Sequence, residues 1–157
     1  MKLEIRETIA RAIHENYRSS RANNTVVNDP SLAEWEKLPE YLRESNRQQA
    51  DDISKKLQRI RCSVQKVTGR SVKRMEFTKD EIETMSEMEH ERWNAERFKD
   101  GWKLGKTKDV QRKISPYLVP WAELPEDVKE WDRETVRKIP EFLAKVGLEL
   151  RRLKQTD

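Results

Sequence analysis

The apolar positions near the amino end of the chain recur with helical spacing. Ile5, Ile9 and Ile13 stand four residues apart. They predict an amphipathic helix over about residues 2–20, because one face of a helix repeats every 3.6 residues. Pro39 suits the first turn of a second helix that runs to about residue 61. The alternation of polar and apolar residues over 62–67 then predicts a short strand.

The same order of signals follows in the second part of the chain. Thr78 and Glu81 form the pattern of a capping box, which predicts a third helix to about residue 99. Pro125 begins a fourth helix that runs to about residue 138, and Pro140 interrupts or restarts it. Alternation over 148–153 predicts a second short strand, while residues 67–74 are turn-like.

Two pairs of segments show that the chain resembles itself. AIHENY at 12–17 resembles MEHERW at 88–93, and WEKLPEYLRESNR at 35–47 resembles WAELPEDVKEWDR at 121–133. We therefore expect one domain over residues 1–157, made of two repeats (about 3–67 and 78–153) joined by a basic turn. The predicted fold class is mainly α, with two helix–loop–helix halves related by a pseudo-twofold axis and short β-strands. Such a pair creates a cleft between its halves, where small ligands often bind.

Composition narrows the class of protein. Charged residues make up 39% of the 157 residues and apolar residues 34%, and there are four Gly, two His and one Cys. No stretch is apolar enough to cross a membrane, and the charged amino end is unlike a signal peptide. One Cys and two His cannot fill a structural zinc site. We expect a cytoplasmic protein without membrane insertion, metal or cofactor.

The charges fall in blocks. Residues 53–75 contain eight bases and no acid, and residues 103–113 contain five bases and one acid. These blocks fit a solvated face with internal ion pairs, or a surface that binds phosphate-bearing ligands. Nucleic-acid binding through segments 53–75 and 103–113 is one alternative function. It ranks behind the leading one because the chain carries no helix-turn-helix or RNA-binding motif.

Several spaced motifs agree in order with a known family. EHERW (89–93), GW (101–102) and SPYLVPWAELPEDVKEWDR (115–133) together resemble the ryanodine-receptor repeat, or RyR domain. The first half, with AIHENY and WEKLPEYLRESNR, resembles the amino-terminal copy of prokaryotic two-copy members. It lacks the Gly-Trp and Leu-Val-Pro elements.

The resemblance implies a helical, non-catalytic module that senses a ligand or binds a protein and serves regulation. It suggests a small anionic or nucleotide-like ligand between the two halves, and a protein partner or a second copy of the chain as further partners. A shared fold does not by itself establish a function. The function must therefore be inferred from the residues of the candidate site.

The candidate ligand-binding residues come from both halves. Tyr17 and Trp93 occupy matching positions and could flank a planar ligand, with Trp102 and Tyr117 closing one side; packing in the core is the alternative role for these rings. Trp35 and Trp121 also match, and we expect both to be packing anchors. The complete candidate set is His14, Tyr17, His90, Arg92, Trp93, Trp102 and Tyr117.

The charged and histidine members of this set have alternative roles. Arg92 can pair with Glu89 and Glu96 along one helix, or contact the ligand. His14 and His90 are expected to form hydrogen bonds across the interface of the halves. His90 with Glu91 could instead be an acid–base pair of an enzyme acting on a nucleotide. No matching nucleophile or second carboxylate accompanies them, so we expect no enzyme activity.

Overall fold

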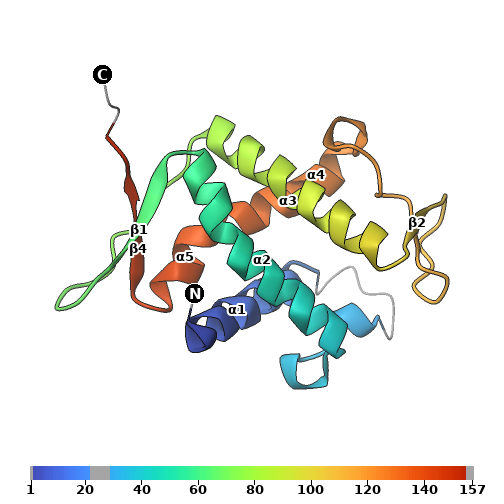
Figure 1. Ribbon diagram of the computed structural model, residues 1–157, viewed down its shortest axis with the longest axis horizontal. Coiled ribbons are helices and arrows are strands. Elements are labelled where there is room, and N and C mark those ends of the chain that lie inside the picture. Colours follow the sequence, from blue (N-terminus) through green and yellow to red (C-terminus); the bar gives the residue numbers. More distant parts are fainter. Residues whose placement is uncertain (1, 22–28, 155–157) are drawn as a thin grey trace. The chain divides into compact units, whose positions relative to one another are not determined.

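The chain folds mainly into helices, as the sequence predicts. The computed structural model describes residues 2–21 and 29–154. Figure 1 shows long helices accompanied by short strands. The residues 22–28 of the predicted first repeat lie outside the described residues. The described chain divides into two compact units, one made of Met1–Phe77 with Arg137–Asp157 and the other of Thr78–Val136. The organisation as one domain with repeats at 3–67 and 78–153 stays a prediction.

The first unit is built on two long helices that contact each other, and the sequence predicts both. Helix α1 spans Leu3–Arg21 and helix α2 spans Glu40–Arg59. Between them lie two short 3₁₀-helices, η1 (Pro30–Leu32) and η2 (Trp35–Lys37). The sequence predicts only a loop there, because a single 3₁₀ turn leaves no periodic pattern.

The core of the first unit lies where α1, α2 and helix α5 (Ile139–Ala144) bury their apolar faces. Its buried apolar side chains include Ile9, Ala10, Ile13, Leu38, Ala50, Ile53, Leu57, Ile139, Phe142 and Leu143. Ile9 and Ile13 belong to the helical stripe that predicts α1. Pro140 stands in the first turn of α5, where a missing N–H costs no hydrogen bond, so the chain restarts as a separate helix.

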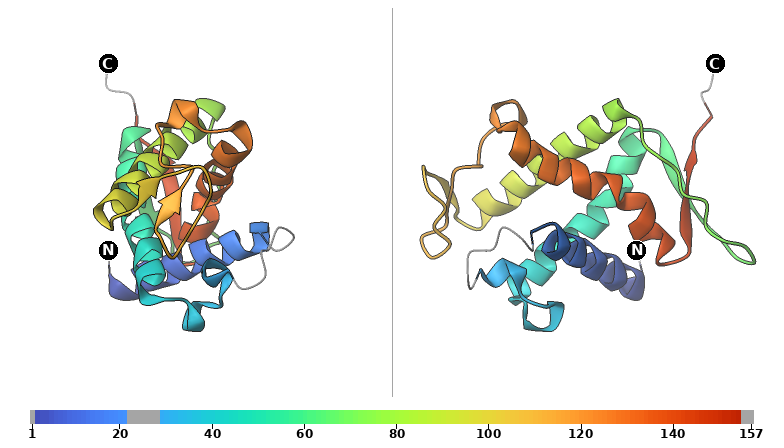
Figure 2. Two further views of the ribbon diagram at one scale, coloured as in Figure 1. Left: turned by 90° about the vertical axis from the view of Figure 1, so that its right-hand side faces the viewer. Right: turned by 180° about the vertical axis from the view of Figure 1, so that it is seen from behind.

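A two-stranded antiparallel sheet completes the first unit. Strand β1 (Cys62–Lys66) pairs with strand β4 (Leu148–Arg152), and Cys62 faces Arg152 while Lys66 faces Leu148. The right view in Figure 2 shows the two strands side by side. The sequence predicts both strands, but their pairing joins residues that are far apart in the chain.

The second unit begins with helix α3 (Lys79–Lys99). The predicted capping box is present: the Thr78 hydroxyl accepts from the Glu81 N–H, and the Glu81 carboxylate accepts from the Thr78 N–H. Gly101 follows the helix with φ +87°, a conformation open to glycine. Helix α3 therefore ends where the sequence predicts.

The rest of the second unit is a long connection followed by helix α4 (Glu126–Arg137). The connection holds two parallel strands of two residues each, β2 (Lys103–Leu104) and β3 (Ile114–Ser115), and the 3₁₀-helix η3 (Trp121–Glu123). Trp121, Leu124 and Val128 form a buried cluster with partly buried Tyr117 and Val119 packed against it. Tyr117 of the candidate set is thus packed against the core of the second unit.

Candidate functional site

His90, a member of the candidate set, packs against Trp93 and Trp121 in the second unit. His90 is 4% exposed, and its Nε2–H donates to the Val119 carbonyl over 2.6 Å. Its ring lies 6.1 Å from the Trp121 ring and 5.8 Å from the Trp93 ring, to which it is nearly parallel. Burial lowers the pKa of His90 below its ordinary value of 6.5. His90 is therefore a neutral packing residue that donates a hydrogen bond near pH 7.

Trp121 is held in place by an ion pair. Its indole Nε1–H donates to the Glu83 carboxylate over 3.2 Å, and Arg133 donates to the same carboxylate over 2.8 and 3.0 Å. The Arg133 guanidinium also lies 5.7 Å from the Trp121 ring. Arg133 is the main reason that the pKa of Glu83 is lowered, with Trp121 contributing. The two charged groups fix the indole from its edge and from its face.

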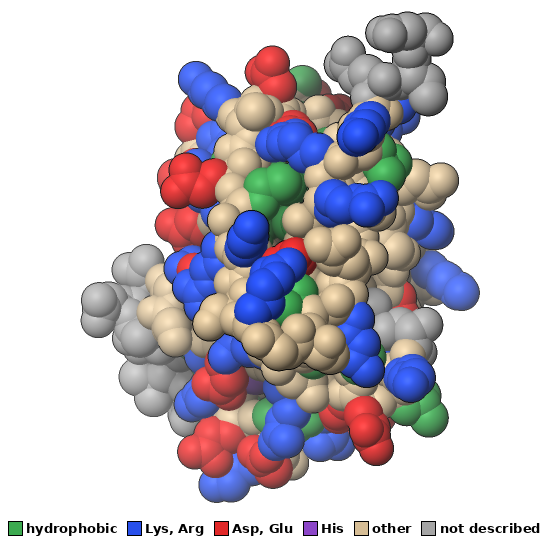
Figure 3. All heavy atoms as spheres, turned by 90° about the vertical axis from the view of Figure 1, so that its left-hand side faces the viewer, with side chains coloured by type: hydrophobic (Ala, Val, Ile, Leu, Met, Phe, Trp, Pro, Cys, Tyr) green, Lys and Arg blue, Asp and Glu red, His purple; other side chains and the backbone are tan. Residues whose placement is uncertain are grey.

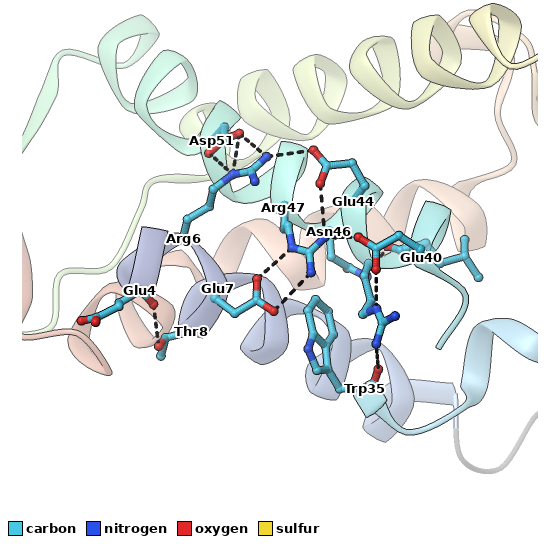
Figure 4. Close-up of polar contacts among 12 residues, drawn as sticks. Glu4, Arg6, Glu7, Thr8, Trp35, Glu40, Glu44, Asn46, Arg47 and Asp51 are labelled. Carbon is cyan, nitrogen blue, oxygen red and sulfur yellow. Dashed lines mark hydrogen bonds and ion pairs between the residues drawn. The ribbon is translucent and has the colours of Figure 1, made fainter. Parts of the chain in front are cut away.

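The first unit contains a corresponding set of contacts around Trp35. Here the Nε2–H of His14 donates to the Ala33 carbonyl over 2.6 Å, and the two rings are 6.1 Å apart. Arg47 lies 5.7 Å from the Trp35 ring and donates to Glu7 over 2.8 Å. Figure 4 shows Glu7, Arg47 and Trp35 meeting in this way. His14, Trp35 and Arg47 lie in the segments of the first half that resemble those of His90, Trp121 and Arg133.

The expected packing role of both tryptophans agrees with their burial, since Trp35 is 6% and Trp121 7% exposed. The histidine contacts differ from the expectation. The Nε2–H of His14 and of His90 each donates to a carbonyl of its own half. That carbonyl, of Ala33 or Val119, lies two residues before the tryptophan that packs against the same histidine. The twofold relation between the halves stays a prediction.

Tyr17 and Trp93, the two rings expected to flank a planar ligand, have other neighbours. Tyr17 lies nearly parallel to the His14 ring, and the Arg21 guanidinium is 5.0 Å from its centre. Trp93 has the same two kinds of neighbour, His90 and the Arg97 guanidinium at 5.3 Å. A histidine ring and a guanidinium therefore contact each of the two aromatic rings.

Arg92 forms the ion pairs that the sequence predicts as one alternative. Its guanidinium donates to both carboxylate oxygens of Glu89 over 2.9 and 2.8 Å, and it lies 3.4 Å from a Glu96 oxygen. Glu89 is 4% exposed, so the buried carboxylate is satisfied by a bidentate partner. These contacts give Arg92 a structural role within α3.

Arg97 is the cation that sequence reasoning missed. Its guanidinium lies 5.3 Å from the Trp93 ring and 5.5 Å from the Trp102 ring, so it joins two residues of the candidate set. One signal could have found it: Arg97 follows Trp93 by four residues, as Arg21 follows Tyr17. Residues four apart lie on the same face of a helix.

Trp102 carries one of the two buried side-chain polar atoms that lack a hydrogen-bond partner among the described residues, and the other is Asn94 Oδ1. The indole is 8% exposed, and its Nε1 is buried with no hydrogen-bond acceptor among the described residues. The Trp102 backbone N–H donates to the Arg97 carbonyl over 2.9 Å, which fixes the indole next to the carboxyl end of α3. A buried donor without an acceptor costs about 1–3 kcal/mol.

The remaining candidate, Tyr117, packs against the cluster of Trp121, Leu124 and Val128. Its ring meets that of Trp131 edge to face, with centres 5.5 Å apart. The described contacts therefore bring Trp93, Arg97 and Trp102 together in the second unit. They place His14 and Tyr17 in the first unit, and Tyr117 with Trp131.

The comparison with known families decides the membership of the chain. A family model described as the RyR domain matches residues 70–152, which is more than half of the chain. The chain belongs to the RyR domain family. The resemblance read from the sequence is thereby confirmed. In this RyR domain protein the match contains His90, Arg97, Trp102 and Trp121, whereas His14 and Tyr17 lie outside it.

This RyR domain protein has neither a membrane-spanning helix nor a cluster of metal-ligating side chains among its described residues. None of its described helices is both long and apolar enough to span a bilayer. The described residues also contain no group of His, Cys, Asp and Glu side chains that could hold a metal ion. The cytoplasmic location stays a prediction.

Proposed function

We propose that this RyR domain protein is a non-catalytic binding module that holds a small anionic, nucleotide-like ligand against Trp102 and Arg97. One observation carries the proposal: the buried Nε1–H of Trp102 lacks an acceptor among the described residues. An oxygen of a phosphate or carboxylate would accept that hydrogen bond. The neighbouring Arg97 guanidinium would complement its charge.

The surroundings of Trp102 favour an anion over a neutral ligand. Five basic residues stand in the connection that follows the indole, namely Lys103, Lys106, Lys108, Arg112 and Lys113, and all are exposed. A group of like charges raises the local concentration of oppositely charged ligands and speeds their association. The aromatic rings of Trp93 and Trp102 add apolar surface that a base or another planar group can contact.

The burial and the hydrogen bond of His90 fit a binding role without catalysis. Its Nε2–H donates to Val119 and its ring is buried, so this nitrogen is not open to a substrate. Glu91, the expected partner in acid–base catalysis, is exposed. Their contacts support packing for His90 rather than proton transfer.

A screen of thermal unfolding with anions tests this proposal. The wild-type protein is measured with mono-, di- and cyclic nucleotides and with pyrophosphate, which carries charge without a base. A ligand present at about 100 times its Kd should add about 2.7 kcal/mol to the free energy of unfolding. Failure of every one of these anions to raise the unfolding temperature would overturn the proposal.

The variant Trp102→Phe separates the indole N–H from the ring. It keeps an aromatic side chain and removes the buried donor, so we expect an unliganded protein of equal or greater stability that no longer responds to the ligand. Trp131→Phe is the matched control, because Trp131 is 36% exposed and lies with Tyr117. A full ligand response in Trp102→Phe would contradict the role given to the N–H.

Protein interaction is the second candidate role. Phe98 is 52% and Leu104 56% exposed, and both lie in the second unit close in sequence to Trp102. Exposed large apolar side chains can mark an interaction surface. Sedimentation of the wild type against Phe98→Ser/Leu104→Ser tests self-association: we expect a concentration-dependent dimer that the double variant loses. A monomer at all concentrations removes the second copy as the partner.

A further inference from the structure

The β1–β4 pair presents one strongly polar face. In an antiparallel pair, residues directly opposite each other lie on the same face. Ser63 faces Arg151 and Gln65 faces Glu149, so these four side chains share a face. The opposite face carries the buried residues Cys62 and Leu150 and, at the end of β1, the exposed Lys66.

The acid on the polar face is already neutralised. Glu149 is 5% exposed, and its oxygens accept from the Arg70 guanidinium over 2.6 and 3.0 Å. The Lys73 backbone N–H donates to Glu149 over 2.9 Å and the Gln65 amide over 2.7 Å. These contacts lower the pKa of Glu149 to about 2. They also hold the turn after β1 against the polar face, which places Lys73 beside it.

Five bases of the strand pair and of the segments next to it form no ion pair within the described chain, unlike Arg70. Arg61, Lys66, Lys73, Arg151 and Lys154 are all exposed, and none forms an ion pair with any residue that the structure describes. We call these five residues the basic ribbon. Figure 3 views the molecule from the side of the strands and shows many Lys and Arg side chains there.

Several arginines of the helices, by contrast, form ion pairs. Arg47 and Arg133 each contact two or more carboxylates, and Arg6 contacts Glu44 and Asp51. Unpaired like charges that lie close together repel each other and oppose the compact state. The basic ribbon therefore gains more from an external polyanion than the paired arginines of the helices do.

The backbone at Arg61 is an independent observation. Arg61 has φ +59°, in the left-handed region where a residue with a side chain costs about 1–2 kcal/mol relative to its ordinary conformation. Glycine occupies such a position after a helix more easily. Backbone strain of this kind clusters at functional sites, and here it presents a cation at the start of β1.

We propose that the basic ribbon binds the phosphate backbone of double-stranded nucleic acid without reading its sequence. A two-stranded β-ribbon fits the major groove of a duplex, and protein–DNA interfaces are more positively charged than protein–protein interfaces. An acidic protein fits less well, because protein interfaces are rich in aromatic residues at their centre. The exposed large apolar side chains of the described ribbon strands and the residue after β4 are Val64 and Leu153, neither of them aromatic.

The test measures binding of the full chain to a short labelled DNA duplex by fluorescence anisotropy between about 50 and 200 mM NaCl. The triple variant Arg61→Gly/Lys66→Ser/Arg151→Ser removes three cations and relieves the strained backbone. Each lost phosphate contact reduces the slope of log Kobs against log salt by about 0.9. We therefore expect a slope shallower by about 2.7 and a weakening of at least tenfold at the lower salt concentration.

The matched control is Lys2→Ser/Lys37→Ser/Lys79→Ser, which removes the same charge from exposed residues outside the basic ribbon. We expect it to bind within about twofold of wild type, because these residues make no phosphate contact. Circular dichroism verifies that both variants are folded. Absence of binding at about 50 mM NaCl, or equal weakening in both triple variants, overturns the proposal.

Competitors identify the polyanion. A duplex RNA should compete as well as duplex DNA, because both offer a phosphate backbone. A polyglutamate peptide or anionic vesicles should compete poorly. If either one binds more tightly than both duplexes, the basic ribbon serves a protein or a membrane and the proposal fails. This result is independent of Trp102→Phe, which alters the other unit.

Discussion

The carboxylate of Glu149 lies 2.6 Å from the guanidinium of Arg70, which is 79 residues earlier in the chain. Arg70 stands in the turn after β1 and Glu149 in β4, so this ion pair fixes the turn to the opposite strand. The carboxylate is buried while the Arg70 side chain is 46% exposed. The pair therefore has a protected acid and an accessible base.

The Glu149 contacts make the stability of the first unit depend on acid pH. The pKa of Glu149 is about 2 in the folded protein and 4.5 in its ordinary state. Its contribution is present above pH 4.5 and is lost as the pH falls from about 5 to 2. Urea unfolding at several pH values should show less loss of stability over this range in Glu149→Gln. An identical pH dependence in both proteins would contradict the assignment.

A second pH dependence comes from His90. Burial lowers its pKa below 6.5, so the folded protein favours the neutral ring. The contribution of the neutral His90 ring to the free energy of unfolding is present above pH 6.5. It is lost as the pH falls through the lowered pKa of His90. An NMR titration of the His90 ring carbons should give a midpoint below 6.5, and His90→Gln should remove that resonance. A midpoint at or above 6.5 would show that the ring is solvated or paired with an acid.

The strained backbone at Arg61 predicts a stabilising substitution. Arg61→Gly relieves the left-handed conformation and should raise the free energy of unfolding by about 1 kcal/mol. For a chain of this length the unfolding temperature should rise by about 2–4 °C. Arg59→Gly is the control, because Arg59 is helical and glycine costs about 1 kcal/mol there. Calorimetry should thus show a higher unfolding temperature for Arg61→Gly and a lower one for Arg59→Gly. A lower unfolding temperature in both variants would show that the backbone at Arg61 is not strained.

The corresponding ion pairs of the two units predict equal coupling energies. Arg47–Glu7 and Arg133–Glu83 each have a closest distance of 2.8 Å, and the arginines are 16% and 17% exposed. Double-mutant cycles with Arg→Met and Glu→Gln should give about 1 kcal/mol for each pair, since the geometry is good and exposure moderate. A measurable coupling energy for only one of the two ion pairs would show that the similar contacts differ in energy.

The sequence predicts the long helices and β1 and β4 well because each has a local signal. Ile5, Ile9 and Ile13 mark α1, and the box of Thr78 and Glu81 starts α3 at the right residue. The strands β2 and β3 were missed, since two residues are too few for a periodic pattern.

The candidate site was predicted only in part. The sequence indicates the aromatic residues, since Trp93 and Trp121 recur in family-like motifs, and one of its two alternatives for Arg92 is the ion pair that forms. The role of Glu149 was missed because its partners are 76 to 84 residues away. Contacts of that range depend on the tertiary fold, which single-sequence patterns do not encode.

The pairing of β1 with β4 sets an order of folding. Residues 78–136 are contiguous and need no later part of the chain to complete their unit. Strand β1, by contrast, lacks its partner until residues 148–152 have been synthesised. Closing a loop of that length before the strands can pair is slow. During translation the second unit can therefore fold first, while the unit that begins the chain is the last to be completed.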